Sequence, residues 1–137
     1  MMKAQAATEY IILLGIILVT LIPLVSYATY KTTSSIRINQ AEDTVQLIAK
    51  TANNLYTLGP GNQDYISFNI PSGTNFLKIQ NENDVVLNMT IFGSYSTVHS
   101  RSKAKIVNIT VLPNQQGTYH LTLKVSDIGE VLIYQPA

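Results

Sequence analysis

Residues that could carry out chemistry are few in this chain, and one carboxylate stands out by its position. Glu9 directly precedes an apolar run, residues 10–28, in which no other charged side chain occurs. A carboxylate at the edge of a hydrocarbon-length segment is costly to bury and commonly marks a functional contact with a partner. The alternative is an interfacial acid that simply reaches water, because the cost of a charge is smallest at the segment edge. The residues themselves leave both interpretations open.

The residue combinations of known catalytic and metal sites are missing. The chain has no cysteine, which excludes disulfides, thiolate metal sites and a cysteine nucleophile. His99 and His120 lie far apart without ligand spacing, and neither a phosphate-binding glycine loop nor a nucleophile elbow occurs. Glu82 and Asp84 fall in a predicted turn, where a solvated role competes with a partial calcium site that lacks its other ligands. We therefore predict no enzyme, no metal site and no cofactor.

Two asparagines stand in glycosylation sequons. Asn88-Met-Thr90 and Asn108-Ile-Thr110 both match the pattern Asn-X-Ser/Thr. A chain this rich in Asn and Thr often contains one or two such triplets by chance, and the strand alternation does not settle whether they are exposed. Asn88 and Asn108 are therefore candidate glycan acceptors if the domain lies outside the cell.

The overall composition excludes one class of partner. Of the 137 residues, 12% are charged, about half the usual share, and the formal net charge is +1. A nucleic-acid-binding domain carries a basic footprint that is missing here, so we predict no nucleic-acid partner. The length suits one ordinary domain with a tail or a membrane segment.

The apolar run that follows Glu9 is long enough to cross a membrane as a helix. Residues 10–28 meet the requirement of about 20 mostly apolar residues. A cleavable secretory signal competes, but it would have more basic residues, a shorter apolar core and a better cleavage site than Ser26-Tyr27-Ala28. We therefore expect the segment to be retained. Pro23 is expected to kink this segment. Gly15 has no side chain and is a place where the helix can be approached closely.

A second helical pattern follows the apolar run. Apolar residues recur at steps of three and four from Ile38 to Leu55, which predicts an amphipathic helix over residues 36–58. Gly59-Pro60-Gly61 ends it. Thr32–Ser35 is the weakest part, because Ser and β-branched residues are middling helix formers. If this part is helical, residues 5–58 form one rod about 80 Å long, at about 1.5 Å per residue.

From Asp64 onward the hydrophobic period changes to two, which is typical of strands. Short strands separated by turns predict a small antiparallel β-sandwich-like domain over residues 64–137, after a linker at residues 59–63. Such a small core would gain stability by packing on the apolar stripe of the helix. The predicted fold class is α+β, a long N-terminal helix packed on this β domain. The expected strands are residues 65–70, 76–80, 85–92, 105–112, 118–125 and 131–134.

The residues around Glu9 resemble the class III signal peptide of the archaeal type IV pilin superfamily. That motif has a Gln, a small residue, a Glu and an aromatic residue in fixed order, followed directly by an apolar helix. Here the motif is Gln5-Ala6-Ala7-Thr8-Glu9-Tyr10, with Ala7 in place of the commoner Ser. The resemblance implies that residues 1–4 are a leader and that a prepilin peptidase cuts between Ala4 and Gln5. Glu9 would then hold the position of the characteristic pilin glutamate.

The resemblance also implies a function for the whole chain. Pilins leave the membrane and bundle their apolar helices into the core of a filament, with the help of an assembly ATPase and a membrane platform. The residues expected to take part in assembly are Gln5, Glu9, Tyr10, Gly15 and Pro23, and the α-amine of a neighbouring copy's Gln5 is the expected partner of Glu9. We therefore expect a structural subunit of an adhesive type IV-like pilus, held in the cell membrane as a precursor and then displayed on the cell surface.

Two other functions stay open. A membrane-anchored extracytoplasmic β domain could bind a ligand without polymerising, and a minor pseudopilin could serve a secretion or uptake machine. Basic residues near the span favour the opposite topology slightly, with Lys3 before it and Lys31 and Arg37 after it. The pilin interpretation requires a cytoplasmic leader and an exported β domain.

Overall fold

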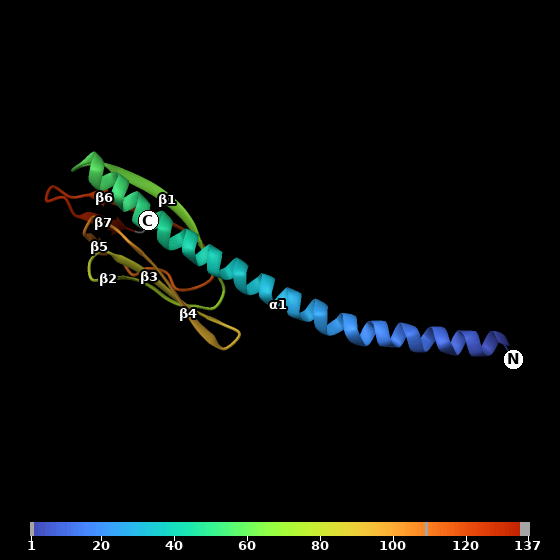
Figure 1. The fold of residues 1–137 in the computed structure, drawn as a ribbon. Coiled ribbons are helices and arrows are strands. Elements are labelled where there is room, and N and C mark those ends of the chain that lie inside the picture. Colours follow the sequence, from blue (N-terminus) through green and yellow to red (C-terminus); the bar gives the residue numbers. More distant parts are fainter. Residues whose placement is uncertain (1, 109, 135–137) are drawn as a thin grey trace. The chain divides into compact units, whose positions relative to one another are not determined.

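The chain forms one long helix followed by a β domain (Figure 1). The computed structural model describes residues 2–108 and 110–134. The chain divides into two compact units after Ser35, so the second half of the helix belongs with the strands. The described elements are α1 (Met2–Leu58), β1 (Gln63–Ile70), β2 (Thr74–Gln80), β3 (Asp84–Ile91), β4 (Ser94–Arg101), β5 (Ile106–Asn108), β6 (Gly117–Val125) and β7 (Val131–Tyr134).

Helix α1 continues through the two places where the sequence suggested weakness. Thr32–Ser35 is helical, and the hydroxyls of Thr32 and Ser34 donate to the carbonyl oxygens four residues earlier, at 2.9 and 3.1 Å. These bonds satisfy the hydroxyls within the helix itself. Pro23 also lies inside the helix. The predicted end is confirmed, because Gly59 adopts a positive φ of 89° and its N–H donates to the carbonyl oxygen of Leu55.

The described strands form two sheets, which confirms the predicted α+β fold class. One sheet has the order β1-β6-β7-β5 and the other the order β2-β3-β4. The strand pairs are antiparallel except for β5 and β7, which run parallel. The domain is therefore rich in antiparallel pairs without being wholly antiparallel.

Strand β4 (Ser94–Arg101) was not predicted from the sequence. Val98 is its only aliphatic side chain and is partly buried against the core, so the strand shows little hydrophobic alternation. The strand pairs with β3 along its whole length, beginning at Ser94 opposite Ile91. Phe92 and Gly93, between them, both have a positive φ, 48° and 83°, as a two-residue primed hairpin turn requires. Backbone pairing, rather than burial of its own side chains, defines this strand.

The strand expected at residues 105–112 is shorter than predicted. Strand β5 covers only Ile106–Asn108, and the described residues from Thr110 to Gln116 are neither helix nor strand. Residue 109 lies outside the described residues. Strand β5 pairs with the short strand β7, and Pro113 lacks the N–H that further pairing would use. The apolar residues 106–112 therefore do not all belong to one strand.

One hydrophobic core joins the second half of α1 to both sheets. The predicted apolar stripe is confirmed, since its helix residues are buried and Ile38 packs partly against them. Burial of each larger aliphatic side chain contributes about 1.5–3 kcal/mol relative to exposure. The helix members of the core are Ala41, Val45, Ile48, Ala49, Ala52 and Leu55, and the largest fully buried strand residues are Ile70, Leu87, Met89, Leu121, Leu123 and Ile133.

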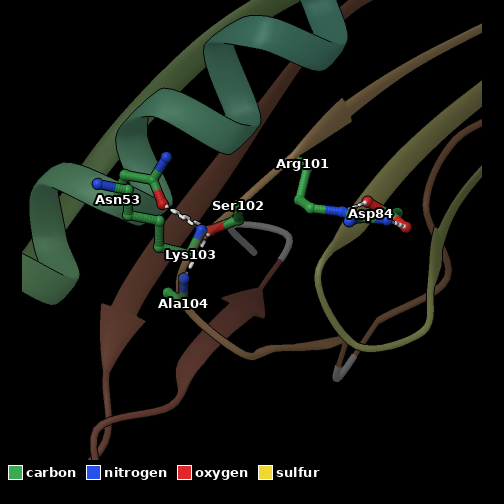
Figure 2. A network of polar contacts seen from close by, with 6 residues as sticks. All are labelled: Asn53, Asp84, Arg101, Ser102, Lys103 and Ala104. Carbon is green, nitrogen blue, oxygen red and sulfur yellow. Dashed lines mark hydrogen bonds and ion pairs between the residues drawn. The ribbon is translucent and has the colours of Figure 1, made fainter.

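Asn53 of α1 forms hydrogen bonds with the segment that follows β4, residues 102–104 (Figure 2). Its side-chain oxygen accepts hydrogen bonds from the hydroxyl of Ser102, at 2.9 Å, and from the backbone N–H of Lys103, at 2.7 Å. The Ser102 oxygen in turn accepts from the backbone N–H of Ala104, at 3.1 Å. Ser102 and Ala104 are buried. We call these three hydrogen bonds, which involve Asn53, Ser102, Lys103 and Ala104, the Asn53 clasp. Because buried polar groups need partners, the clasp fixes the path of the chain between β4 and β5.

The same segment, residues 102–106, also holds two turns in place. The N–H of Ser102 donates to the carbonyl oxygen of Asn83, and the N–H of Ile106 donates to that of Glu82. Lys105 forms ion pairs with Glu82 at 3.3 Å and with Glu130 at 2.9 Å. Residues 102–106 therefore connect the helix, the β2–β3 turn and the β6–β7 turn.

We predict that Asn53→Ala lowers the free energy of unfolding by about 1–3 kcal/mol, because it leaves the Ser102 hydroxyl and the Lys103 N–H without their acceptor. The measurement is urea unfolding of the full chain in detergent, followed by circular dichroism. Asn54→Ala is the matched control, since its side chain is exposed on the same helix turn, and we expect it to stay within about 0.5 kcal/mol of the native chain. Equal effects of the two substitutions would contradict a role for the clasp.

Candidate functional site

The first unit carries an apolar surface on all sides of its helix. Large hydrophobic side chains from Tyr10 to Tyr27 are exposed by between 44% and 72%. The most apolar 18-residue window has a mean hydropathy of 2.6, and none of it is buried inside the chain. By length and composition this helix can cross a membrane. A helix that is hydrophobic all round is stable when lipid or other apolar surfaces cover it.

The hydroxyl groups within this apolar segment are satisfied by the helix itself. Thr20 donates to the carbonyl oxygen of Ile17 at 2.8 Å, and Ser26 donates to that of Ile22 at 2.9 Å. Thr29 makes the same contact with the residue four positions earlier, at 2.9 Å. Hydrocarbon offers no partner to a polar group, so internal satisfaction suits these residues to a lipid or helix-bundle environment.

Glu9 lies on the exposed surface one helical turn after Gln5. The Gln5 side-chain amide donates to a Glu9 carboxylate oxygen at 3.4 Å, which is long for a hydrogen bond. A carboxylate can accept several hydrogen bonds, so this long contact, the one recorded among the described side chains, uses little of its capacity. Tyr10, which follows it, is 66% exposed. Gln5, Glu9 and Tyr10 thus stand together at one end of the apolar surface.

The other predicted processing and assembly residues lie on the same helix. Ala4 and Gln5, on either side of the predicted cut, have helical backbone, and the side chain of Ala4 lies outside the described residues. A Cβ added at Gly15 would have no heavy atom within 4 Å, so no contact within the described chain requires glycine there. A small residue on an exposed apolar helix permits close approach of a second helix. Pro23 removes one backbone donor from the apolar segment.

The two acids considered for a calcium site are held in ion pairs. Asp84 receives a bidentate contact from the Arg101 guanidinium, at 2.7 and 3.0 Å (Figure 2), and Glu82 pairs with Lys105. Among the described side chains, no group of three or more His, Cys, Asp or Glu comes together. His99 on β4 and His120 on β6 are exposed and belong to different sheets.

Charge pairing shifts the proton affinities of these groups. Hydrogen bonds from Arg101 lower the pKa of Asp84 below its ordinary value of 3.8. Burial raises this pKa in part, and the positive charge of Arg101 lowers it further. The hydrogen bonds that the Lys105 ammonium donates to Glu130 and Glu82 raise the pKa of Lys105 above 10.5. The Asp84–Arg101 pair joins β3 to β4. The pair could not be predicted from the sequence, because β4 itself was not predicted.

The two sequons occupy different settings. Asn88 is half-buried in β3, the central strand of its sheet, whereas Asn108 is exposed at the end of β5. The middle residue of the second sequon, residue 109, is outside the described part of the chain.

No family model, curated protein or solved structure matches this chain. The resemblance to pilins therefore rests on the motif from Gln5 to Tyr10 and on the apolar helix that follows it.

We predict that Asp84→Asn lowers the melting temperature at pH 7 and that the difference from the native chain disappears as the pH falls. The folded pKa of Asp84 is depressed, so its contribution to stability is present above the unfolded pKa and is lost as the pH falls through the folded pKa. Thermal unfolding of the full chain in detergent between pH 7 and about pH 2 measures this difference. That pH interval is chosen because it brackets the ordinary pKa of an aspartate side chain, about 3.9.

Asp127→Asn is the control, because Asp127 is exposed in the β6–β7 turn. A deficit for Asp84→Asn that stays constant with pH would show that the carboxylate charge does not account for the effect.

Proposed function

We propose that this chain is a pilin, the structural subunit of an extracellular type IV-like filament that assembles through its apolar N-terminal helix and serves in adhesion. The observation that carries the proposal is the apolar helix surface of residues 10–28, none of whose most apolar window is buried in the chain. Glu9 at its entrance, in register with Gln5 as a mature N-terminus, adds a motif that a simple membrane anchor does not need.

The apolar surface supports the proposal because it needs a cover outside its own chain. Lipid can cover it before assembly, and copies of the same helix can cover it afterwards. A subunit with this surface can therefore be held in a membrane and later leave it for a polymer core. Repetition of one heterologous contact along a helical axis produces a filament rather than a closed ring.

Glu9 gives the packing of these helices a defined register. A carboxylate buried among apolar helices needs a partner charge and further hydrogen bonds. Removal of residues 1–4 by a prepilin peptidase would create an α-amine on Gln5, and the amine of a neighbouring copy would be available to Glu9. A pilus ATPase and its membrane platform would supply the work of extraction, and the β domain would face the outside of the filament.

We predict that the mature protein in its producing cells begins at Gln5, as read by N-terminal sequencing or intact mass. Ala4→Leu should block processing, because the peptidase of the resembled family cuts after a small residue. Ala28→Leu is the matched control, since it changes the competing signal-peptide site and should leave the Gln5 start unchanged. An intact Met1 would favour the membrane-anchored binding module, and a start near Thr29 would identify a cleaved secretory signal.

We also predict that Glu9→Gln and Glu9→Val leave a membrane-bound, folded subunit but reduce sheared surface fibres at least about tenfold. Loss of one partner from a buried ion pair costs about 3–5 kcal/mol, which suffices for such a reduction. Electron microscopy and quantification of sheared fibres measure the effect. Glu42→Gln is the control, because Glu42 is exposed on the same helix. Normal fibres from both Glu9 variants would refute the assigned role of Glu9.

A further inference from the structure

The two sequons are equivalent in sequence but not in the fold. We propose that Asn108 is the residue that carries an N-linked glycan and that Asn88 is a structural residue that stays unmodified. The inference depends on the proposed function only for the extracytoplasmic location of the β domain. The sugar donor is an oligosaccharide linked to a lipid phosphate, and the partner is an oligosaccharide transferase.

The reaction sets a clear requirement on the acceptor. The side-chain Nδ2 of asparagine attacks C1 of the first sugar, the C1–O bond to the lipid phosphate breaks, and a new N–C1 bond forms. One amide proton is released, and the lipid phosphate leaves with the electron pair. The sequon also requires a Ser or Thr two residues later, so the amide nitrogen and that hydroxyl must be accessible to the enzyme together.

The amide of Asn88 is already bonded on both of its sides. Its Oδ1 accepts from Nδ2 of Asn75 at 2.7 Å, and its Nδ2 donates to the hydroxyl of Thr97 at 2.8 Å. A shift in the β2–β3 register between Thr74 and Phe76 leaves Asn75 as the extra residue of β2, next to Asn88 and Thr90. Attachment of a sugar at Nδ2 would place C1 beside the bond to Thr97 and disturb this ladder.

The Thr of the same sequon is also held in place. The hydroxyl of Thr90 accepts from Nδ2 of Asn75 at 2.9 Å, and its backbone N–H donates to the carbonyl oxygen of Gly73 at 2.7 Å. Strand β3 is paired with β2 on one side and β4 on the other. The first sequon therefore cannot leave the sheet without breaking backbone pairs along both edges.

Asn108 meets the requirement that Asn88 fails. Its side chain is exposed, and it is the last residue of β5, which ends the sheet order β1-β6-β7-β5. Thr110 lies in a bend, and the chain from there to Gln116 is irregular. Among the described residues, the strand pairing that this sequon contributes is the last position of one short pair, Asn108 opposite Ile133. Although Leu112 in this segment is buried, Val111 is exposed, and surface segments without strand pairing are more mobile than the strands they connect.

The test is mass spectrometry of peptides from the full-length protein, produced in an archaeal host whose own extracellular glycoprotein confirms an active pathway. Sheared filaments and the membrane fraction are both examined, so the glycan is read whether or not filaments form. We expect an oligosaccharide mass on the peptide that contains Asn108 and none on the peptide that contains Asn88. Asn108→Gln and Thr110→Ala should remove the mass, whereas Thr110→Ser, Asn88→Gln and Thr90→Ala should retain it.

A glycan on Asn88, or two unmodified sequons on a protein that external protease can reach, would overturn the inference and leave the filament proposal intact. A glycan on Asn108 without filaments would support the inference and count against the filament proposal. A β domain that external protease cannot reach in intact cells would overturn both.

Discussion

The structure depends on one helix that carries two different surfaces. Residues 10–28 of α1 expose apolar side chains on every side, whereas the second half of the helix buries a stripe against the strands. The hydrophobic effect acts on both halves, but with different consequences. The apolar side chains of the first half can be buried only by contact with lipid or with other molecules. The second half supplies the layer against which a small β domain completes its core.

The β domain needs that layer because its own strands are short and partly polar. A domain of this size buries a limited share of its surface, so each additional apolar face matters. Six helix residues from Ala41 to Leu55 enter the core. Polar contacts then fix the connections: Asn53 holds the segment after β4, and Lys105 holds two turns. Apolar burial supplies the stability, and these hydrogen bonds specify the path of the chain.

Glu9 and the sequons illustrate how a motif acquires meaning from its surroundings. Among the described side chains, the Glu9 carboxylate accepts one long hydrogen bond, from Gln5, and a carboxylate has the capacity to accept several more. Asn88 and Asn108 share a triplet pattern, but the bonds around Asn88 commit its amide to the sheet. Two identical sequence patterns can therefore differ in whether the asparagine amide is accessible to an enzyme.

The sequence by itself determined the features that depend on local pattern. The apolar run, the helical stripe, the stop at Gly59 and five of the strands follow from periodicity and turn chemistry, which act over a few neighbouring residues. Tertiary structure decided β4, the shortness of β5, its parallel pairing with β7 and the Asp84–Arg101 contact. These features depend on backbone pairing and on side chains far apart in the chain, which no local pattern encodes. Glu9 and the motif from Gln5 to Tyr10 were identified by sequence alone, whereas the difference between Asn88 and Asn108 arises only when the strands are paired.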